Sequence, residues 1–385
     1  MKKILLAISG SIAFYKAYEL ISLFKKEGFY VKVLLSNGVL KFVNAISFEA
    51  LANEILHENN ESWLNENNHI AFSKDVDLVI FAPATINSIN KLAYGIADNL
   101  FIQTLIAIKA PILIAPAANT NMYNHFSTQN SLQILKKQGA IIIDPICKKL
   151  ACNEVGIGAL ADIEDIFYQS KRILFSKKFF MDKKIIISGG GTKEKIDDVR
   201  CISNFSSGKM AKAIADAFYF LGANVILLSS VDFKTPYKIE KFQSSLELKE
   251  KLQKYKNFDI LIMAAAVSDF IPQIFKGKIK KNEHLNGLDL KLKLNEDILK
   301  NLDFKGKKIG FKLEFDKKNA LKNAKKSLID KNLDMVCLNI FDENMSFGSD
   351  ENNLCFITKE NISQNFRQSK EKLGFTLAQE LRKLW

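Results

Sequence analysis

The sequence predicts an α/β protein made of two units, each with a doubly wound and mostly parallel sheet. Short apolar runs alternate along the chain with segments whose apolar residues recur at helical spacing, and this alternation begins again near residue 184. Small residues such as glycine and serine follow several of the apolar runs. Continuous apolar strands separated by helices are typical of parallel sheets that are buried on both faces.

Two domains are expected from the length of the chain. Its 385 residues exceed what one ordinary core holds, since a domain has on the order of 150 residues. We place the first domain at residues 1–172 and the second at residues 184–385. The segment between them, 173–183, is cationic and contains no glycine turn, so we assign it as a linker.

The first half supplies the elements of one sheet. Strands are expected at residues 4–9, 31–35, 78–82, 112–115 and 140–143, and helices at residues 12–26, 89–108 (broken at Gly95) and 132–138. Ligands of doubly wound sheets bind beyond the carboxyl ends of the strands, so the residues that follow these strands are the first candidates for a site.

The second half repeats this alternation with different residues. Strands are expected at residues 185–188, 225–228, 260–264, 288–294, 309–311 and 335–339, a hairpin across 346–358, and helices at 209–221, 246–256, 318–331 and from Ser369 onward. No repeat at a fixed period is present, so the two halves are analogous units and not copies of one sequence.

The charge of the chain favours anionic small molecules. The formal net charge is +13, and most of the excess lies in the second half. A basic surface attracts nucleotides and phosphorylated metabolites. No nucleic-acid partner is expected, because no basic run is interleaved with aromatic residues.

The cysteines and the first residues indicate a cytoplasmic protein. The five cysteines are odd in number and scattered, which is typical of reduced thiols and not of a disulfide framework. Cys147 and Cys152 form the only close pair, and no histidine or second pair completes a zinc site. The first apolar run stops at Ser9, too early for a secretory or membrane segment, so no membrane partner is expected.

A phosphate cradle is expected at the start of the second unit. The strand at 185–188 is followed by the turn Gly189-Gly190-Gly191-Thr192, and Ser206, Ser207 and Gly208 precede the helix at 209–221. Backbone N–H groups at a helix N-terminus bind anions, and serine and glycine let a phosphate approach closely.

The first half carries motifs at the strand ends and near the end of the domain. They are Ser9-Gly10-Ser11-Ile12-Ala13, His69-Ile70, Pro83-Ala84-Thr85-Ile86-Asn87, Gly95-Ile96-Ala97-Asp98-Asn99-Leu100, Pro116-Ala117-Ala118-Asn119-Thr120-Asn121-Met122-Tyr123 and Ala151-Cys152-Asn153-Glu154-Val155-Gly156-Ile157-Gly158. The first lacks the G-x-G-x-x-G spacing of a dinucleotide site. With these residues, the first half resembles the flavin-dependent cysteine decarboxylase family.

This resemblance implies a Rossmann-like, flavodoxin-like fold, FMN as the cofactor and 4'-phosphopantothenoylcysteine as the substrate. It implies that His69 acts in the oxidative and decarboxylating step, that Asn119 holds the substrate carboxylate and that Cys152 protonates the enethiolate. A near-neutral histidine can take a thiol proton, and a cysteine can act as a weak acid. The residues implied to contact FMN are Gly10, Ser11, Ile12, Ser36, Ala84, Thr85, Asn87 and Asp98.

The chain departs from the decarboxylase pattern at three places. Ala118 replaces a methionine, Asn153 replaces the usual glycine after the cysteine, and Ala159-Leu160 stands in place of Arg-Met. The last two lie in the loop that the resemblance implies to close over the substrate, in which Cys152 is retained.

The second half contains a longer ordered series of motifs. They are Gly189-Gly190-Gly191-Thr192, Ile196-Asp197-Asp198-Val199-Arg200-Cys201-Ile202-Ser203-Asn204-Phe205-Ser206-Ser207-Gly208, Ala264-Ala265-Ala266-Val267-Ser268-Asp269-Phe270, Lys278-Ile279-Lys280-Lys281, Asn295-Glu296-Asp297-Ile298-Leu299, Gly310-Phe311-Lys312-Leu313-Glu314, Lys331-Asn332-Leu333-Asp334 and Phe347-Gly348-Ser349-Asp350. In these motifs, this half resembles the phosphopantothenate–cysteine ligase family. Departures include Asp198 and Glu296, which replace prolines, and Ser327, which replaces a lysine beside Lys326.

The ligase resemblance implies activation of a carboxylate by CTP through an acyl-cytidylate, which the amine of cysteine then attacks. It implies that Asn204 orients the acyl intermediate and that Lys278 stabilises charge at the α-phosphate, a task that needs a cation at the reacting centre. Mg²⁺ is expected on the triphosphate, with protein ligands unknown. The residues implied to contact CTP are Ser206, Ser207, Gly208, Met263, Ala264, Ala265, Asp269, Lys278, Glu296, Asp297, Ile298, Leu299, Phe311 and Lys331.

The two resemblances together cover nearly the whole chain, as in the fused bacterial enzymes of coenzyme A biosynthesis. They imply that the ligase half makes the compound that the decarboxylase half consumes. They also imply a homo-oligomer with trimeric decarboxylase units and dimeric ligase units, for which a dodecamer is one arrangement.

Two other functions are compatible with parts of the sequence. An NAD(P)-linked oxidoreductase with two Rossmann units would bind nicotinamide and lack flavin absorbance. A flavin-bearing nucleic-acid-binding protein is suggested only by the charge of +13 and would bind DNA in a salt-dependent manner.

Overall fold

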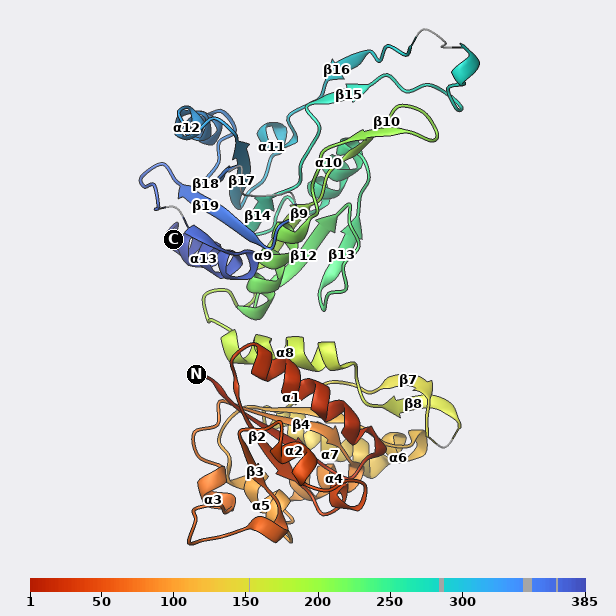
Figure 1. Ribbon diagram of the computed structural model, residues 1–385, viewed down its shortest axis with the longest axis vertical. Coiled ribbons are helices and arrows are strands. Elements are labelled where there is room, and N and C mark those ends of the chain that lie inside the picture. The colour runs from red at the N-terminus through yellow and green to blue at the C-terminus, as the bar shows by residue number, and fades with distance from the viewer. Residues whose placement is uncertain (152, 284–286, 342–347, 365) are drawn as a thin grey trace. The chain divides into compact units, whose positions relative to one another are not determined.

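The computed structural model describes residues 1–385 apart from residues 152, 284–286, 342–347 and 365 (Figure 1). The chain divides into two compact units, Met1–Leu174 and Phe175–Trp385. Each unit contains one large, mainly parallel sheet whose strands alternate with helices, which confirms the predicted α/β class.

The sheet of the first unit has six parallel strands in the order β3-β2-β1-β4-β5-β6. Their bounds are β1 (Lys3–Ile8), β2 (Tyr30–Leu35), β3 (Glu54–Leu56), β4 (Leu78–Ala84), β5 (Ile112–Pro116) and β6 (Ile141–Ile142). Only β3 is absent from the sequence prediction, because three residues are too few for a periodic signal. The strand order reverses between β1 and β4, and this switch point is where such sheets bind ligands.

The helices of the first unit are η1 (Ile12–Tyr15), α1 (Lys16–Lys26), η2 (Val39–Lys41), α2 (Ile46–Glu49), η3 (Glu58–Asn60), α3 (His69–Phe72), α4 (Ile86–Tyr94), α5 (Leu100–Ala107), α6 (Thr120–Asn124), α7 (Phe126–Lys137) and α8 (Ile163–Phe175). In α1, the buried residues Ala17, Leu20, Ile21 and Phe24 recur at helical spacing, which gives one apolar face toward the sheet. Residues 173–175 of the predicted linker belong to α8.

The predicted helix at 89–108 is two helices. Gly95 ends α4 with a φ of 69°, in the left-handed region that glycine adopts readily. Asn99 then begins α5, since its side chain accepts a hydrogen bond from the Ile102 amide at 3.0 Å. The polar turn between the helices, residues 95–99, therefore separates α4 from α5.

A hairpin lies where the sequence predicts only a glycine-spaced loop. Its strands are β7 (Ile146–Lys149) and β8 (Val155–Ala159), which pair antiparallel. Alternating glycines at 156 and 158 hide the strand pattern of β8 in the sequence.

The sheet of the second unit has eight strands in the order β13-β12-β9-β14-β17-β18-β19-β20. Their bounds are β9 (Lys184–Gly189), β12 (Asn224–Ser229), β13 (Lys238–Lys241), β14 (Ile260–Met263), β17 (Lys307–Glu314), β18 (Met335–Ile340), β19 (Glu351–Ile357) and β20 (Phe366–Ser369). Neighbours from β13 to β18 run parallel, whereas β19 pairs antiparallel with both β18 and β20.

The hairpin predicted across 346–358 is wrong in the part that the structure describes. Residues 351–357 form one continuous strand, and residues 346 and 347 lie outside the described residues. Most of β19 is buried, because it lies between two strands of the main sheet. The second half of this strand, residues 354–357, is a continuous apolar run, so the sequence pattern alone does not identify its partners.

The helices of the second unit are α9 (Lys209–Phe220), α10 (Ser245–Lys254), η4 (Lys281–Glu283), α11 (Ile298–Asn301), α12 (Ala320–Asp330) and α13 (Lys370–Arg382). The two long helices α9 and α13 pack closely. A Cβ atom on Gly374 of α13 would lie 2.6 Å from the Ala213 carbonyl oxygen of α9, so only glycine allows this approach.

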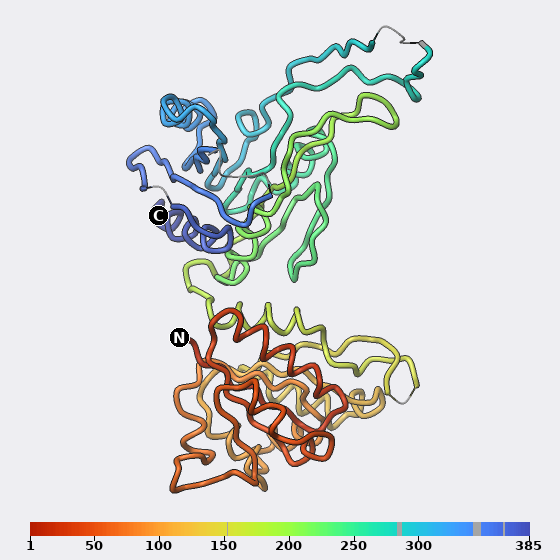
Figure 2. Tube along the Cα trace, in the orientation of Figure 1, coloured from red at the N-terminus to blue at the C-terminus, as the bar shows by residue number. Residues whose placement is uncertain are grey.

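Two small antiparallel sheets extend from the second unit. One pairs β10 (Lys193–Lys195) with β11 (Cys201–Ser203), and the other pairs β15 (Phe270–Pro272) with β16 (Leu292–Leu294). Figure 2 shows the chain between β14 and α11 leaving the main sheet as an extended segment, which we call the arm (residues 270–283 and 287–294). The predicted strand at 288–294 therefore contributes β16 to the arm and not to the main sheet.

In the described ranges, no helix combines the length and apolar character needed to cross a membrane.

Candidate active sites

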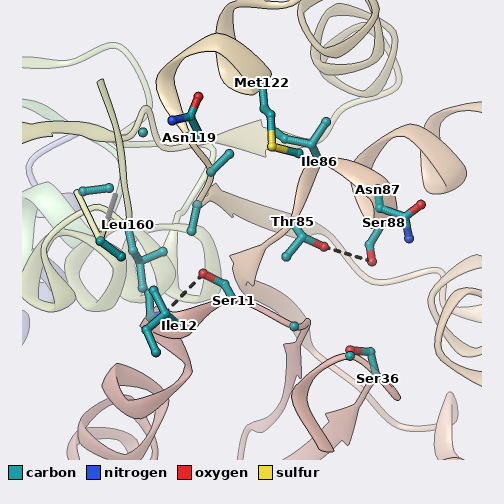
Figure 3. Close-up of a pocket in the computed structure, with 18 of the residues that line it drawn as sticks. Ser11, Ile12, Ser36, Thr85, Ile86, Asn87, Ser88, Asn119, Met122 and Leu160 are labelled. Carbon is teal, nitrogen blue, oxygen red and sulfur yellow. Dashed lines mark hydrogen bonds between the residues drawn. The ribbon is translucent and has the colours of Figure 1, made fainter. Parts of the chain in front are cut away.

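The first unit has a cavity of about 850 Å³ at the carboxyl ends of its strands (Figure 3). The loops after β1, β2, β4 and β5 form its walls, and the β7–β8 hairpin contributes one side. Of the residues implied to bind FMN or substrate, those in the cavity wall are Gly10, Ser11, Ile12, Ser36, Thr85, Asn87 and Asn119.

Close backbone contacts and buried hydroxyl groups shape this cavity. A Cβ atom on Gly10 would lie 2.6 Å from the Gly38 carbonyl carbon, so glycine lets the loops after β1 and β2 meet. Ser9 Oγ donates to the Pro83 carbonyl and accepts from the Thr85 amide, each at 2.8 Å, which joins the loops after β1 and β4.

Ser36 is the residue of this wall that most clearly suits a polar ligand group. Its Oγ is buried and has no hydrogen-bond partner among the residues that the structure describes, and the residue lines the cavity. A buried hydroxyl without a partner is costly, so this atom fits a polar ligand group such as a phosphate oxygen.

Asn119 connects the end of β5 with the hairpin. Its Oδ1 accepts from the Asn121 amide at 2.9 Å, which caps α6, and its Nδ2 donates to Glu154 Oε2 at 3.4 Å. Gly158 has a φ of 156°, and a Cβ atom there would lie 2.2 Å from the Ala118 carbonyl oxygen. The hairpin is thereby held against the loop that presents Asn119 to the cavity.

Cys152 lies outside the described residues, between the two strands of this hairpin. Its neighbour Ala151 lines the cavity. The Leu150 amide donates to the Glu154 carbonyl at 2.8 Å, and the Asn153 amide donates to the Leu150 carbonyl at 2.9 Å.

Three predicted residues lie outside the wall of this cavity. His69 begins α3, packs edge-on against Trp63 with ring centroids 5.6 Å apart, and has Nδ1 3.5 Å from Glu61 Oε1. Asp98 is exposed and pairs with Lys91 at 2.6 Å, which lowers the pKa of its carboxyl group. Ala84 is fully buried as the last residue of β4.

The cavity also contains residues that the sequence analysis does not identify. Lys16 lines it, and so do Lys148 and Lys149 of β7. Burial lowers the pKa of Lys16, and the ammonium group of Lys148 lowers it further. The position of Lys16, about one helical turn after Ile12, is a signal that could have identified it.

The second unit has a cavity of about 220 Å³ next to the start of α9. Of the residues implied to bind CTP, those that line it are Ser206, Ser207, Gly208, Ala264, Ala265 and Phe311. A Cβ atom on Gly189 would lie 2.2 Å from Ala211 Cβ, so this glycine lets α9 approach the end of β9. The predicted cradle and the end of β14 therefore share one cavity.

The other residues implied to bind CTP lie outside this cavity wall. Met263, Ile298 and Leu299 are buried in the core, and Asp269 follows β14. Asp297 caps α11 through the Lys300 amide at 3.0 Å and pairs with Lys331 at 2.9 Å, while Glu296 pairs with Lys249. Asn204 Nδ2 donates to the Val267 carbonyl at 3.2 Å, which ties the cradle loop to the loop after β14.

Lys278 is exposed on the arm, and residues on both sides of it are fixed to the loop between β10 and β11. Asp198 Oδ2 accepts from the Gly277 amide at 3.1 Å, and Asp197 Oδ2 accepts from the Ile279 amide at 3.1 Å. Arg200 Nη2 donates to the Ile279 carbonyl at 2.7 Å. The backbone at Lys278 is therefore held while its side chain stays accessible.

No group of three or more His, Cys, Asp or Glu residues within the described part of the chain is arranged to hold a metal ion.

The matches to known families divide the chain between residues 174 and 180, next to the boundary between the two units of the structure. The profile of the Flavoprotein family matches residues 1–174, and that of the DNA/pantothenate metabolism flavoprotein C-terminal domain matches residues 180–384. The coenzyme A biosynthesis bifunctional protein CoaBC of Bacillus subtilis is 37% identical and covers 99% of this chain and 96% of its own length. The protein of the same name from Borreliella burgdorferi is 34% identical, with 97% of each chain covered.

Two solved structures are similar to one half each. A PPC decarboxylase mutant complexed with pantothenoylaminoethenethiol is 30% identical, with a TM-score of 0.39, and covers 44% of this chain and 96% of its own. The C-terminal domain of a CoaBC protein is 28% identical, with a TM-score of 0.44, and covers 54% of this chain and 98% of its own.

Proposed function

The chain belongs to the family of bifunctional coenzyme A biosynthesis proteins, which combine an FMN-dependent decarboxylase with a ligase, and from this premise we propose how its residues divide the two reactions. The first unit would decarboxylate 4'-phosphopantothenoylcysteine to 4'-phosphopantetheine. The second would make that substrate from 4'-phosphopantothenate, cysteine and CTP. The comparisons do not favour a nicotinamide oxidoreductase or a nucleic-acid-binding protein.

FMN would occupy the cavity of the first unit. The buried, unpaired Oγ of Ser36 carries this assignment, because it offers a hydrogen bond in the cavity wall. Ser11, Thr85 and Asn87 provide further polar groups at the strand ends. When bound, FMN supplies the oxidation of the substrate thiol and the later return of the electrons.

Asn119 and Cys152 would act on the substrate beside the flavin. The Asn119 side chain lies at the cavity wall, where a neutral amide can orient a carboxylate that must leave as carbon dioxide. Cys152, whose sequence neighbour Ala151 lines the cavity, would donate the proton that converts the enethiolate to the thiol product.

His69 would serve the cavity of a neighbouring copy. Its place on α3, outside the cavity wall of its own unit, supports the trimeric arrangement implied by the resemblance, as does the exposure of Trp63, Leu64 and Ile70 around it. Apolar side chains exposed together indicate a surface that another chain covers.

In the second unit, the cradle Ser206-Ser207-Gly208 would bind the triphosphate of CTP, and Phe311 would pack against the base. A carboxylate oxygen of 4'-phosphopantothenate attacks the α-phosphorus, and pyrophosphate leaves. The cysteine amine then attacks the acyl carbon, CMP leaves and an amide forms. Lys278 would stabilise charge at the α-phosphate, and Asn204 would orient the acyl intermediate.

Mg²⁺ would bind chiefly through the oxygens of the triphosphate, because this ion keeps several waters and needs few protein ligands.

The ligase would be dimeric. A groove of about 1040 Å³ beside the arm is lined by Leu246, Ile271, Ile274, Leu292 and Leu294, most of which are exposed and suited to a second copy.

The test supplies 4'-phosphopantothenate, cysteine, CTP and Mg²⁺ to the pure protein and follows pyrophosphate and carbon dioxide. We expect both products and a flavin absorbance spectrum, and ATP in place of CTP tests the nucleotide preference. If neither product forms, the proposed division of reactions is wrong. Carbon dioxide from added 4'-phosphopantothenoylcysteine, without CTP, isolates the first unit.

A further inference from the structure

We propose that Lys370, the first residue of α13, is a phosphate-binding residue of the ligase site. The proposal rests on the function given above to the cavity of the second unit. The motifs of the sequence analysis do not include Lys370, which lies far along the chain from the cradle.

The geometry places Lys370 in the wall of the same cavity as Ser206, Ser207 and Gly208. A Cβ atom on Gly348 would lie 4.0 Å from Ser207 Cβ, so the segment that leads to β19 packs against the cradle. The backbone amide of Lys370 donates to the Asp350 carbonyl at 2.9 Å, which fixes the start of α13 to that segment. The cradle and Lys370 therefore approach one space from opposite ends of the unit's sequence.

The ammonium group of Lys370 is incompletely neutralised. Its Nζ donates to the Ser349 carbonyl, and no carboxylate of the described residues forms an ion pair with it. Burial lowers the pKa of Lys370, and the ammonium group of Lys209 lowers it further, while Asp350 raises it. Asp350 itself pairs with Lys209 at 2.7 Å and is largely exposed.

The other charged side chains at this cavity are already paired. Glu351 lies 3.7 Å from Arg367, and Lys312 lies 3.4 Å from Glu314. A half-buried cation that shares a cavity wall with serine hydroxyl groups and the N-terminus of α9 forms a site suited to an anion.

The anion that fits is a phosphoryl group, because it accepts hydrogen bonds from ammonium, hydroxyl and backbone amide groups together. Two substrates of the proposed reaction carry one: the triphosphate of the nucleotide and the 4'-phosphate of the acid. Loss of a hydrogen bond to a charged group weakens binding by roughly tenfold or more.

The experiment compares Lys370→Gln and Lys370→Arg with the control Lys372→Gln, which removes an exposed charge from the same helix. Pyrophosphate release gives the KM values for CTP and for 4'-phosphopantothenate. We expect Lys370→Gln to raise one of them by about tenfold. We expect Lys370→Arg to recover most of that loss and Lys372→Gln to match the natural protein.

The two phosphate sources give different results. A rise in the KM for CTP, with a smaller thermal shift caused by inorganic pyrophosphate, assigns Lys370 to the triphosphate. A rise in the KM for 4'-phosphopantothenate alone assigns it to the 4'-phosphate. Either result supports the proposal, and unchanged KM values in a folded Lys370→Gln protein overturn it.

One further variant covers the case in which Lys370→Gln does not fold. The activity of the natural protein separates failure of this proposal from failure of the proposed ligase function. Should Lys370→Gln unfold, Lys370→Met keeps the aliphatic part of the side chain and provides the same KM comparison. If the natural protein releases no pyrophosphate, the proposed ligase function has failed. If it does and the variants equal it, only the role of Lys370 has failed.

Discussion

Asp197 and Arg200 form an ion pair in which Asp197 Oδ2 accepts hydrogen bonds from Arg200 Nε at 3.0 Å and Nη2 at 2.5 Å. Asp197 Oδ1 accepts from the amides of Val199 and Arg200 at 2.8 and 2.7 Å. The same pair binds both the amide and the carbonyl of Ile279 on the arm. One buried carboxylate therefore organises its own turn and fixes the arm beside Lys278.

Asp197→Asn should lower the stability of the second unit in a pH-dependent manner. Burial opposes ionisation of Asp197, but Arg200 and the backbone amides outweigh it and hold its pKa well below the usual range. Because the folded pKa lies below the unfolded value of about 3.9, this stabilisation is present above that value and is lost as the pH falls toward the folded pKa.

Urea unfolding of both proteins at several pH values tests this prediction. The midpoint of the variant should be lower at pH values near neutrality, and the difference should narrow below a pH of about 3.9. Asp330→Asn, at an exposed helix end, is the matched control. A difference that is constant with pH would show that the ionised carboxylate is not responsible.

Ser36→Ala should weaken the retention of FMN. The substitution removes the unpaired buried hydroxyl group of the first cavity, and a neutral hydrogen bond contributes about 0.5–1.5 kcal/mol, so the Kd should rise by roughly two- to tenfold. Flavin titration of the apoprotein measures this Kd. Ser22→Ala removes an exposed hydroxyl group from α1 and should leave it unchanged; equal Kd values for both variants would contradict the assignment.

Gly158→Ala should impair the decarboxylase and spare the ligase. The new Cβ atom would lie 2.2 Å from the Ala118 carbonyl oxygen, so the hairpin must move away from the loop that carries Asn119. Overpacking of this kind costs about 1–3 kcal/mol. The measurement is carbon dioxide release beside pyrophosphate release, with Gly139→Ala as the control.

That control separates two effects. Gly139 also has a positive φ, 92°, but a Cβ atom there meets nothing within 4 Å, so it tests backbone strain without a clash. Equal losses of decarboxylase activity in both variants would argue against displacement of the hairpin.

Cys152→Ser should allow loss of carbon dioxide but stop the formation of the thiol product. A serine hydroxyl is a much weaker acid than a thiol, so the enethiolate would not receive its proton efficiently. Mass spectrometry of the products, with Cys147→Ser as the control, distinguishes the unsaturated compound from 4'-phosphopantetheine. A normal yield of 4'-phosphopantetheine from Cys152→Ser would remove this residue from the reaction.

Periodicity predicts the parallel strands well, because β1 or β14 is buried on both faces and therefore apolar throughout. It does not predict β3 or the β7–β8 hairpin, in which short length and glycines leave little pattern. Sequence reasoning identifies residues of the cavity wall best where they follow a strand directly, as Ser36 and Thr85 do.

Residues that reach a cavity from a helix, and not from a loop that follows a strand, are harder to predict. Lys16 reaches the first cavity from within a helix, and Lys370 reaches the second from the start of the last helix. Neither belongs to a motif, since their places depend on how helices pack and not on the local sequence.

The missing side chain of Gly374 has a consequence beyond packing. Because Gly374 lets α13 approach α9 closely, the start of α9, which follows the cradle, and the start of α13, which carries Lys370, are held near each other. A bulkier residue at position 374 would increase the distance between α9 and α13. It would thereby change the spacing between the cradle and Lys370 without replacing a residue of either. The width of the proposed nucleotide site thus depends on the absence of a Cβ atom about one helical turn from Lys370.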